Sequence, residues 1–474
     1  MSNPFGPSPI QEIQELLQAR KFAEAEKKAR ARIAANPDDP DLHALRASAL
    51  LPMGQFDLAE KELRKCIELR PHEVTPWLNY GRFLQQTNRW GDALTHYANA
   101  VRSFPGEAQI IATFGQLLQR AGKFAEAEAA FREAMKLEPS ASTQALLGMV
   151  VLRQDRVEEA IAHFQTAIEL DPNNAAAYGN LGNAEQKKGD FEAAAEAYRR
   201  CHELSPRDVL PLVSRGMALM KLGRWKEAAA IFEEALGNYG PERRAAAWLP
   251  FMRAQEMGQL PAGYRAEIGR VVTRATLDMP EGYASMEEFN AALAEALRED
   301  PSTVWEPAGK ATRGGGQTGL LLDKPREPFI AFEKMLRKAI DAHFASIRRE
   351  TGHPFFGQVP ESYQIDMWGT LLSEGGHQHA HIHAGGWMSG VYYVALPPVV
   401  NETENKETKE GWIEFGAPPP DFTPEFEVET VTFEPQEGNA FFFPSYLFHR
   451  TLPFKGDTQR ISLAFDVKPM AWRR

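Results

Sequence analysis

The feature that most constrains the fold of this chain is a sequence repeat of about 34 residues in its N-terminal half. Prolines recur at intervals of 33 to 35 residues, at Pro37, Pro71, Pro105, Pro139, Pro172, Pro206 and Pro241. Residues that tolerate a left-handed backbone recur with them, at Gly54, Asn88, Gly122, Asp155, Gly189 and Gly223. Such residues end one helix and let an antiparallel partner begin. The repeat therefore predicts stacked helix pairs, because a generic bundle would not keep one register six times.

Small and bulky residues also keep fixed offsets from each turn residue. Alanine stands five positions after every turn, at Ala59, Ala93, Ala127, Ala160, Ala194 and Ala228. A large apolar residue stands two positions after it, at Phe56, Trp90, Phe124, Val157, Phe191 and Trp225. Small residues at helical spacing let two helices approach closely, and the bulky residue fills the groove of the next repeat.

This pattern resembles the tetratricopeptide repeat over roughly residues 10–240, in about seven units. The first unit is atypical, with Arg32 where a small residue belongs, as expected for an exposed cap. The resemblance implies an all-α superhelix that binds a peptide or protein in its concave groove. One register facing that groove reads Leu45, Asn79, Thr113, Leu146, Asn180 and Ser214. Its asparagines could hold a peptide backbone, or the register is a solvated inner face.

Composition limits the partners and the compartment. The net charge of −11 argues against non-specific nucleic-acid binding, which needs a basic surface. No run of 18 apolar residues is present, and the N-terminus lacks a basic segment followed by an apolar one. We therefore expect no membrane span and a cytoplasmic protein. The two cysteines, Cys66 and Cys201, are expected to be unpaired core residues, since four repeats separate them.

Beyond Pro241 the repeat fades and the composition changes. Helical patterns recur in four segments, at 242–258, 262–277, 286–299 and 329–351. The glycine-rich stretch at 310–319 lacks the phosphate-loop pattern and is predicted to be a turn-rich lead into a second domain. The predicted domains are a repeat solenoid at 1–240, a helical connector at 241–284 and a C-terminal domain at 285–474.

From Tyr363 onward apolar and polar residues alternate with period two, and aromatic and β-branched residues become frequent. Turn-forming residues separate these runs, which predicts an antiparallel all-β domain of the sandwich or barrel type. Four histidines alternate inside it, at His377, His379, His381 and His383. On one strand they would share one face, which favours metal ligation over four separate structural roles.

A metal site needs a further ligand from another strand. His449 is the candidate, because it follows a turn and a short apolar strand. Arg460 and Ser462 stand shortly beyond it. An arginine buried in a barrel without a carboxylate partner is costly, and a guanidinium that faces a dicarboxylate cosubstrate would resolve that cost.

At this point residues 285–470 resemble the double-stranded β-helix (jelly-roll) oxygenases that use Fe(II) and 2-oxoglutarate. Their pattern is H-x-D/E, a tyrosine-bearing strand, a distal histidine and an arginine beyond it. The stretch HIHAGGWMSGVYYV is close to bacterial oxygenases that are often fused to tetratricopeptide repeats. The resemblance implies His381 and His449 as iron ligands, and Arg460 with Ser462 on the far carboxylate of 2-oxoglutarate. Tyr393 would touch the same carboxylate, or it is a barrel-core aromatic.

One departure from that pattern concerns the carboxylate position, which holds His383. Either His383 binds the metal in place of the acid, or water or another group completes the coordination. We predict that His383 is the third ligand. Three histidines would leave the ion less neutralised and make it a stronger Lewis acid. His377 and His379 are then candidates for positions behind the ligands or facing the substrate.

The resemblance implies a dioxygenase that consumes O2 and 2-oxoglutarate, releases succinate and carbon dioxide, and by default hydroxylates a C–H bond. The repeats favour a peptide or protein substrate, with no nucleic acid and no membrane partner. Two alternatives stay open. Gly375, His381 and His383 also fit a cupin motif, which would suit a metal-dependent dioxygenase that does not use 2-oxoglutarate. The protein could also be a repeat scaffold with an inactive β domain, although the retained ligands argue against it.

Overall fold

A computed structural model describes residues 8–472 of the chain. The start of the N-terminal stretch in which no secretory signal is expected, residues 1–7, lies outside the described residues, as do residues 473–474. The chain divides into two compact units, Met1–Ser205 and Pro206–Arg474. The predicted domain limits at 240 and 284 stay predictions. Among the described residues, no helix has the length and apolar character needed to cross a membrane.

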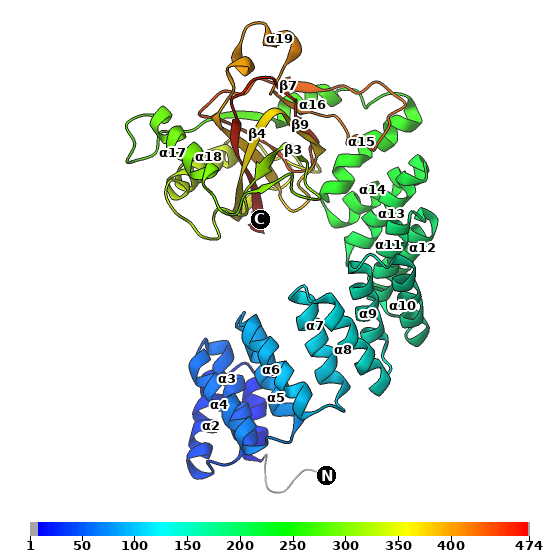
Figure 1. Ribbon diagram of the computed structural model, residues 1–474, viewed down its shortest axis with the longest axis vertical. Coiled ribbons are helices and arrows are strands. Elements are labelled where there is room, and N and C mark those ends of the chain that lie inside the picture. Colours follow the sequence, from blue (N-terminus) through cyan, green and yellow to red (C-terminus); the bar gives the residue numbers. More distant parts are fainter. Residues whose placement is uncertain (1–7, 473–474) are drawn as a thin grey trace. The chain divides into compact units, whose positions relative to one another are not determined.

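The repeat region consists of seven successive helix pairs, α1 to α14 (Figure 1). Their bounds are α1 Pro9–Gln18, α2 Phe22–Ala35, α3 Pro40–Leu50, α4 Phe56–Leu69, α5 Val74–Gln86, α6 Trp90–Ser103, α7 Ala108–Arg120, α8 Phe124–Leu137, α9 Ala141–Arg153, α10 Val157–Leu170, α11 Ala175–Lys188, α12 Phe191–Leu204, α13 Val209–Lys221 and α14 Trp225–Tyr239. All six predicted turn residues have positive φ, between 57° and 91°. The sequence therefore predicted six of the places where the chain reverses between helices.

Close approach of the two helices in a pair depends on a missing side chain. A Cβ atom added to Gly115 would lie 2.8 Å from Cε1 of Phe131, and one added to Gly148 would lie 2.7 Å from Cε1 of Phe164. Both aromatic rings are fully buried. The six alanines at the predicted small positions are also fully buried. Cys66 and Cys201 are both buried, and burial raises the pKa of the Cys66 thiol to about 11, so the prediction that both are core residues is confirmed.

The second unit adds helices and an antiparallel sheet. Its helices after the repeats are α15 Arg243–Met257, α16 Tyr264–Val271, α17 Met286–Arg298, α18 Phe329–Ser346 and α19 Asn405–Thr408. Its strands are β1 Thr273–Thr276, β2 Val304–Trp305, β3 Thr312–Gln317, β4 Pro360–His381, β5 Met388–Ala395, β6 Ile413–Phe415, β7 Val431–Phe433, β8 Asn439–Pro444, β9 His449–Thr451 and β10 Arg460–Trp472. The predicted fold class, all-α repeats followed by an antiparallel β domain with flanking helices, is confirmed.

Three local predictions in this unit were wrong. The helix expected at 262–277 ends at Val271, and residues 273–276 form β1, which pairs with β8. The helix expected at 329–351 ends at Ser346. The glycine-rich stretch at 310–319 is largely the strand β3, because Gly315 has no side chain and can lie directly against the backbone of Leu371 in β4. Periodicity alone does not show such a tertiary pairing.

The strand order β1-β8-β5-β10-β4-β9-β6-β7 places the two longest strands, β4 and β10, at the centre of the sheet. The hairpin of β2 and β3 is attached to β4. Helices α17 and α18 lie beside the sheet (Figure 1) and enter its hydrophobic core. The hydroxyl of Tyr392 donates to Asn290 of α17, and its ring contacts Phe332 of α18 with 4.9 Å between centroids. The helices thus close one face of the sheet and leave the other for a cavity.

Candidate active site

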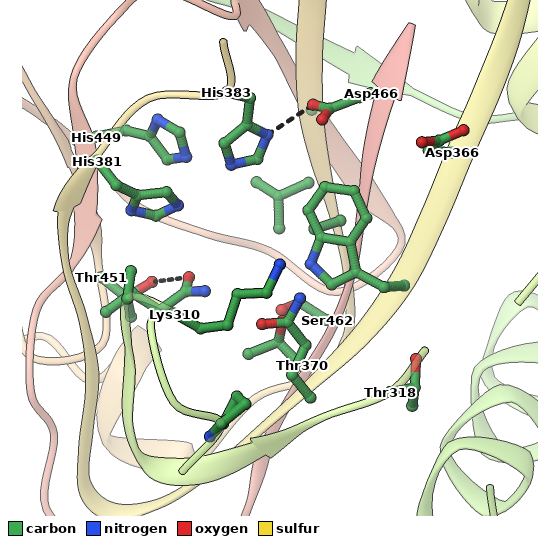
Figure 2. Close-up of a pocket in the computed structure, with 18 of the residues that line it drawn as sticks. Lys310, Thr318, Asp366, Thr370, His381, His383, His449, Thr451, Ser462 and Asp466 are labelled. Atoms are coloured by element: carbon green, nitrogen blue, oxygen red, sulfur yellow. Dashed lines mark hydrogen bonds and ion pairs between the residues drawn. The ribbon is translucent and has the colours of Figure 1, made fainter. Parts of the chain in front are cut away.

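Strand pairing brings His381 and His449 together. His381 ends β4 and lies opposite His449, the first residue of β9, with 4.3 Å between the ring centroids. His383 lies two residues beyond the end of β4. Its backbone N–H donates to the carbonyl of Ser445 at 2.9 Å, and this hydrogen bond holds the residue in place. Its ring lies 5.1 Å from each of the other two. The three rings face one another at the wall of a cavity (Figure 2).

The three imidazoles are oriented so that one nitrogen of each is left for a metal ion. Each offers one nitrogen, and these atoms lie within 4.8 Å of one another. In every ring Nδ1 faces an oxygen. Nδ1 of His381 lies 2.7 Å from the carbonyl oxygen of His379, and Nδ1 of His449 lies 3.0 Å from that of Leu447. Nδ1 of His383 lies 2.6 Å from Oδ1 of Asp466. Since Nδ1–H donates to these oxygens, the lone pair of each ring is on Nε2. Two ligands about 2 Å from one ion lie up to about 4 Å apart, so the set fits a single ion after a small closure.

Burial favours the neutral form of the imidazoles that a metal requires. It lowers the pKa of His381 to about 4, with a smaller contribution from His383. It also holds the pKa of His449 well below its usual range. Both rings are therefore neutral near pH 7 and available as ligands without loss of a proton.

The expectation that four histidines share one face of a strand was wrong. β4 contains an irregularity between Gln378 and His381, where its pairing with β9 changes register. Gln378 lines the cavity, whereas His377 and His379 do not. The rings of His377 and His379 pack against each other with 4.9 Å between centroids. Because a bulge inserts one extra residue, the alternation of side chains is reversed across it.

Arg460 lies in the cavity wall with almost no exposure, at 1%. Its Nε donates to the carbonyl of Gly411 at 3.2 Å, and no carboxylate among the described residues is paired with it. The guanidinium carbon lies 5.0 Å from the centroid of the Tyr393 ring. The Tyr393 side chain is fully buried behind Arg460 and is not part of the cavity lining. The cavity therefore contains a buried cation that has no counter-ion among residues 8–472.

A polar group beside Arg460 is also left without a partner. Ser462 lies opposite Thr370 on β4 and opposite Tyr393 on β5. The Thr370 hydroxyl is buried and has no hydrogen-bond partner within the described part of the chain, and the Tyr393 hydroxyl is buried beside Arg460. Burial raises the pKa of Tyr393 to about 12, against the opposing effect of the Arg460 charge. Buried polar groups are normally paired, so this cluster fits a ligand that accepts hydrogen bonds.

Asp466 is the main site residue that sequence reasoning missed. Its Oδ1 accepts from Nδ1–H of His383 and, at 2.6 Å, from the hydroxyl of Ser389. The Ser389 hydroxyl is itself 2.8 Å from the hydroxyl of Ser445, and both serines are fully buried. A signal for Asp466 was present, because Arg460, Ser462, Ala464 and Asp466 alternate along β10 and all line the cavity. Extending the period of two from Arg460 would have found it.

The cavity has a volume of about 650 Å³ and continues away from the histidines. Asp366, Trp368 and Thr370 line it from β4, again with period two. Asp366 forms an ion pair with Lys468. Lys310, from the segment before β3, extends its ammonium group into the cavity (Figure 2). The volume suits a small cosubstrate together with one side chain of a larger substrate.

A sheet with three convergent imidazoles and a buried arginine in one cavity defines a candidate metal-dependent active site. Comparison with known families agrees with that class. Residues 366–466 match the family described as "Putative 2OG-Fe(II) oxygenase". Residues 40–73, 113–175, 145–209 and 213–249 match tetratricopeptide repeat families. The matches therefore show tetratricopeptide repeats followed by a C-terminal region that matches the "Putative 2OG-Fe(II) oxygenase" family, which is the fusion that the motifs predicted.

Individual proteins are also similar to parts of the chain. A TPR repeat-containing protein of Dictyostelium discoideum is 27% identical over 103 residues, which are 20% of this chain and 39% of that protein. The chain thus spans about two fifths of the length of this relative. The structure of MamA is similar at 25% identity, with a TM-score of 0.32, over 33% of this chain and 92% of MamA. Part of a TPR protein from Cytophaga hutchinsonii is 18% identical, with a TM-score of 0.42, over 50% of this chain and 98% of that structure.

Proposed function

We propose that the second unit is a 2-oxoglutarate- and Fe(II)-dependent dioxygenase that hydroxylates a peptide or protein recruited by the repeats. The observation that carries this proposal is the coexistence, in one cavity, of three convergent Nε2 atoms and a buried arginine without a counter-ion. Neither feature stabilises the folded chain by itself, because both leave polar groups unpaired. A metal ion and a carboxylate ligand would satisfy them together.

His381, His383 and His449 would hold the iron through Nε2. When bound, iron supplies the redox chemistry that couples O2 and the decarboxylation of 2-oxoglutarate to oxidation of a substrate C–H bond. Val391, Ile413 and Phe443 line the same cavity, and the Phe443 ring lies 4.6 Å from the His449 ring. Such apolar side chains exclude water from the reacting atoms.

Arg460 would bind a carboxylate of 2-oxoglutarate through two parallel hydrogen bonds, because a guanidinium matches a carboxylate in shape and charge. The hydroxyls of Thr370 and Ser462, on neighbouring strands, would donate to the same group. Tyr393 would support Arg460 from the side away from the cavity, because its ring lies against the guanidinium. A carboxylate at this place would remove the cost of the buried cation.

Asp466 would supply the negative charge that the three-histidine ligand set lacks. Nδ1–H of His383 donates to it, so the charge reaches the ion through the imidazole ring. Ser389 holds the carboxylate in place from the next strand. The arrangement explains how a histidine can stand at a position where the related oxygenases carry an acid.

The three-histidine set also suits a cupin-type dioxygenase that does not use 2-oxoglutarate. The two functions differ in the role that they give to Arg460. A dioxygenase without the keto acid has no carboxylate to place against this buried cation, whereas the proposed function uses it directly.

The experiment measures succinate release from 2-oxoglutarate by the full chain with Fe(II) and O2. We expect release that is lost in His449→Ala, and a large rise of the KM for 2-oxoglutarate in Arg460→Gln. Anaerobic Fe(II) titration serves as the control, since Arg460→Gln should still bind the metal. Oxygen consumption without succinate, or a KM unchanged in Arg460→Gln, would overturn the use of 2-oxoglutarate and favour the cupin-type function.

A further inference from the structure

Helix α15, which follows the repeats, is fixed by aromatic rings beside the candidate metal site. Trp248 and Phe251 of α15 are buried against Phe448, with 4.9 Å and 5.8 Å between the ring centroids. Phe422, from the segment between β6 and β7, packs on both α15 rings, at 5.2 Å from Trp248 and 6.0 Å from Phe251. Phe448 directly precedes the ligand candidate His449. These contacts give α15 a defined position relative to the site.

Arg243, the first residue of α15, makes a second contact with the region of the site. Its Nε donates to the carbonyl of Gly386 at 2.9 Å, and its Nη1 donates to the carbonyl of Pro241 at 3.0 Å. The neighbouring Glu242 carboxylate caps α15 instead, where it accepts from the N–H of Ala245 at 2.7 Å. Burial lowers the pKa of the Arg243 guanidinium, which forms no ion pair within residues 8–472. Two carbonyls compensate a partly buried cation less well than an acid does, so stability alone does not explain this arginine.

Gly386 connects Arg243 to His383 and Asp466. Its N–H donates to the carbonyl of His383 at 3.2 Å. A Cβ atom added to Gly386 would lie 2.5 Å from Oγ of Ser445 and 3.3 Å from Cγ of Asp466. The glycine therefore lies directly against the carboxylate that accepts from Nδ1–H of His383. Because Arg243 binds the carbonyl of this glycine, it holds the turn that carries the ligand candidate.

We infer that Arg243 is a positioning residue for the metal centre, and that it holds the turn of residues 383–386 so that Nε2 of His383 faces the other two imidazoles. His383 needs this support because it lies beyond the strand pairing that joins His381 to His449. Arg243 does not line the cavity, so it acts through Gly386. The inference rests on the metal site of the proposed function and adds to it a residue of the helix that follows the repeats.

The test compares Arg243→Met with Arg253→Met in the full chain. Methionine keeps a flexible apolar side chain and cannot donate to Gly386. Arg253 lies on the same helix and pairs with Glu233 in an exposed ion pair, so the control removes the same charge. Co(II) titration followed by visible absorption is expected to show about tenfold weaker binding for Arg243→Met, and unchanged binding for Arg253→Met.

Chemical denaturation of the metal-free chain separates positioning from folding. Because Arg243 has no acidic partner, the unfolding free energy of Arg243→Met should match that of Arg253→Met. A loss of Co(II) affinity that occurs only together with a lowered unfolding free energy would assign Arg243 to the fold and overturn the inference. Arg243→Lys restores a donor and should bind Co(II) more tightly than Arg243→Met, whereas equal binding by these two variants would contradict a role for the hydrogen bond.

Hydrogen–deuterium exchange of the metal-free chain gives a readout that does not depend on the metal. The amides of His383 and Gly386, which donate to Ser445 and His383, should exchange faster in Arg243→Met and at an unchanged rate in Arg253→Met. Equal exchange in the two variants would overturn the inference. If the unaltered chain bound no Co(II), the proposed function would fail, and the exchange rates would still decide whether Arg243 holds the turn.

Discussion

The two units treat polar groups in opposite ways. In the repeats the fully buried positions are apolar, such as Ala127 and Phe131, and buried acids such as Glu62 and Glu128 pair with arginines. In the second unit Arg460, His449 and Thr370 are buried among apolar strands. Within the described residues the Thr370 hydroxyl has no hydrogen-bond partner, and Arg460 has no acidic partner. The first arrangement stabilises a scaffold. The arrangement in the second unit lowers the stability of the fold. Buried polar groups without partners are usually retained where a ligand will pair with them, so this arrangement is suited to a binding site.

The largest expected effect is the loss of the metal centre. His449→Ala should reduce affinity for Co(II), used as a spectroscopic stand-in for iron, by more than about 100-fold, because one of three ligands is removed. The measurement is a titration followed by the visible absorption of the bound ion. His379→Ala is the control, since its ring lies outside the cavity lining, and it should leave the titration unchanged. A similar loss of Co(II) affinity in both variants would contradict the proposed set of metal ligands.

A smaller loss of metal affinity is expected when the carboxylate of Asp466, which accepts a hydrogen bond from His383, loses its charge. Asp466→Asn should weaken Co(II) affinity by about 10- to 100-fold, because His383 loses the carboxylate that orients its ring. Asp366→Asn is a close control, since Asp366 lies opposite Asp466 on β4, lines the same cavity and contacts no histidine ligand. If the two variants bind the ion equally well, Asp466 does not position the metal centre.

In the repeats, the stability of the fold should depend on how closely the paired helices pack. Gly148→Ala would place a methyl group 2.7 Å from the buried ring of Phe164, so we expect a loss of about 1–3 kcal/mol of unfolding free energy by chemical denaturation. Gly91→Ala, in α6, meets nothing within 4 Å and should be neutral or slightly stabilising. Equal stability of the two variants would show that the paired helices tolerate a wider spacing than the glycines suggest.

The smallest predicted effect is on acid stability. Burial lowers the pKa of His343 from 6.5 to about 4 in the folded chain, so the unfolded chain binds a proton that the folded chain does not between these values. The stability from neutral His343 is thus present above pH 6.5 and is lost as pH falls toward 4. Between pH 7 and pH 5 the loss should be about 1–2 kcal/mol.

His343→Phe tests this assignment, because phenylalanine keeps a ring against Phe442 and cannot be protonated. The variant should lose less unfolding free energy between pH 7 and pH 5 than the unchanged chain. The comparison isolates His343 because both proteins keep the other buried histidines. Parallel stability curves would contradict the role of His343.

Much of the molecule could be predicted from the order of its residues. The period of 34 located the turn residue of six helix pairs, because each repeat packs mainly on its neighbours. The spacing of His381, His383, His449, Arg460 and Ser462 predicted a cluster, and all five line one cavity. Their roles as ligands and cosubstrate contacts stay predictions. What failed was local geometry, as in β3 and in the bulge of β4, where a pairing partner far along the chain decides the conformation.

The sequence by itself determined the repeat architecture and the β character of the C-terminal region, and it predicted the three histidines of the candidate metal site. Tertiary structure alone decided which imidazole nitrogens converge, that Asp466 stands behind His383, and that Arg460 is buried without an acid. The physical reason is the range of the contacts. Helix pairs are encoded by neighbours within one repeat, whereas the site forms only when strands about 70 to 100 residues apart come into register, as His381 with His449 and Asp366 with Asp466 do.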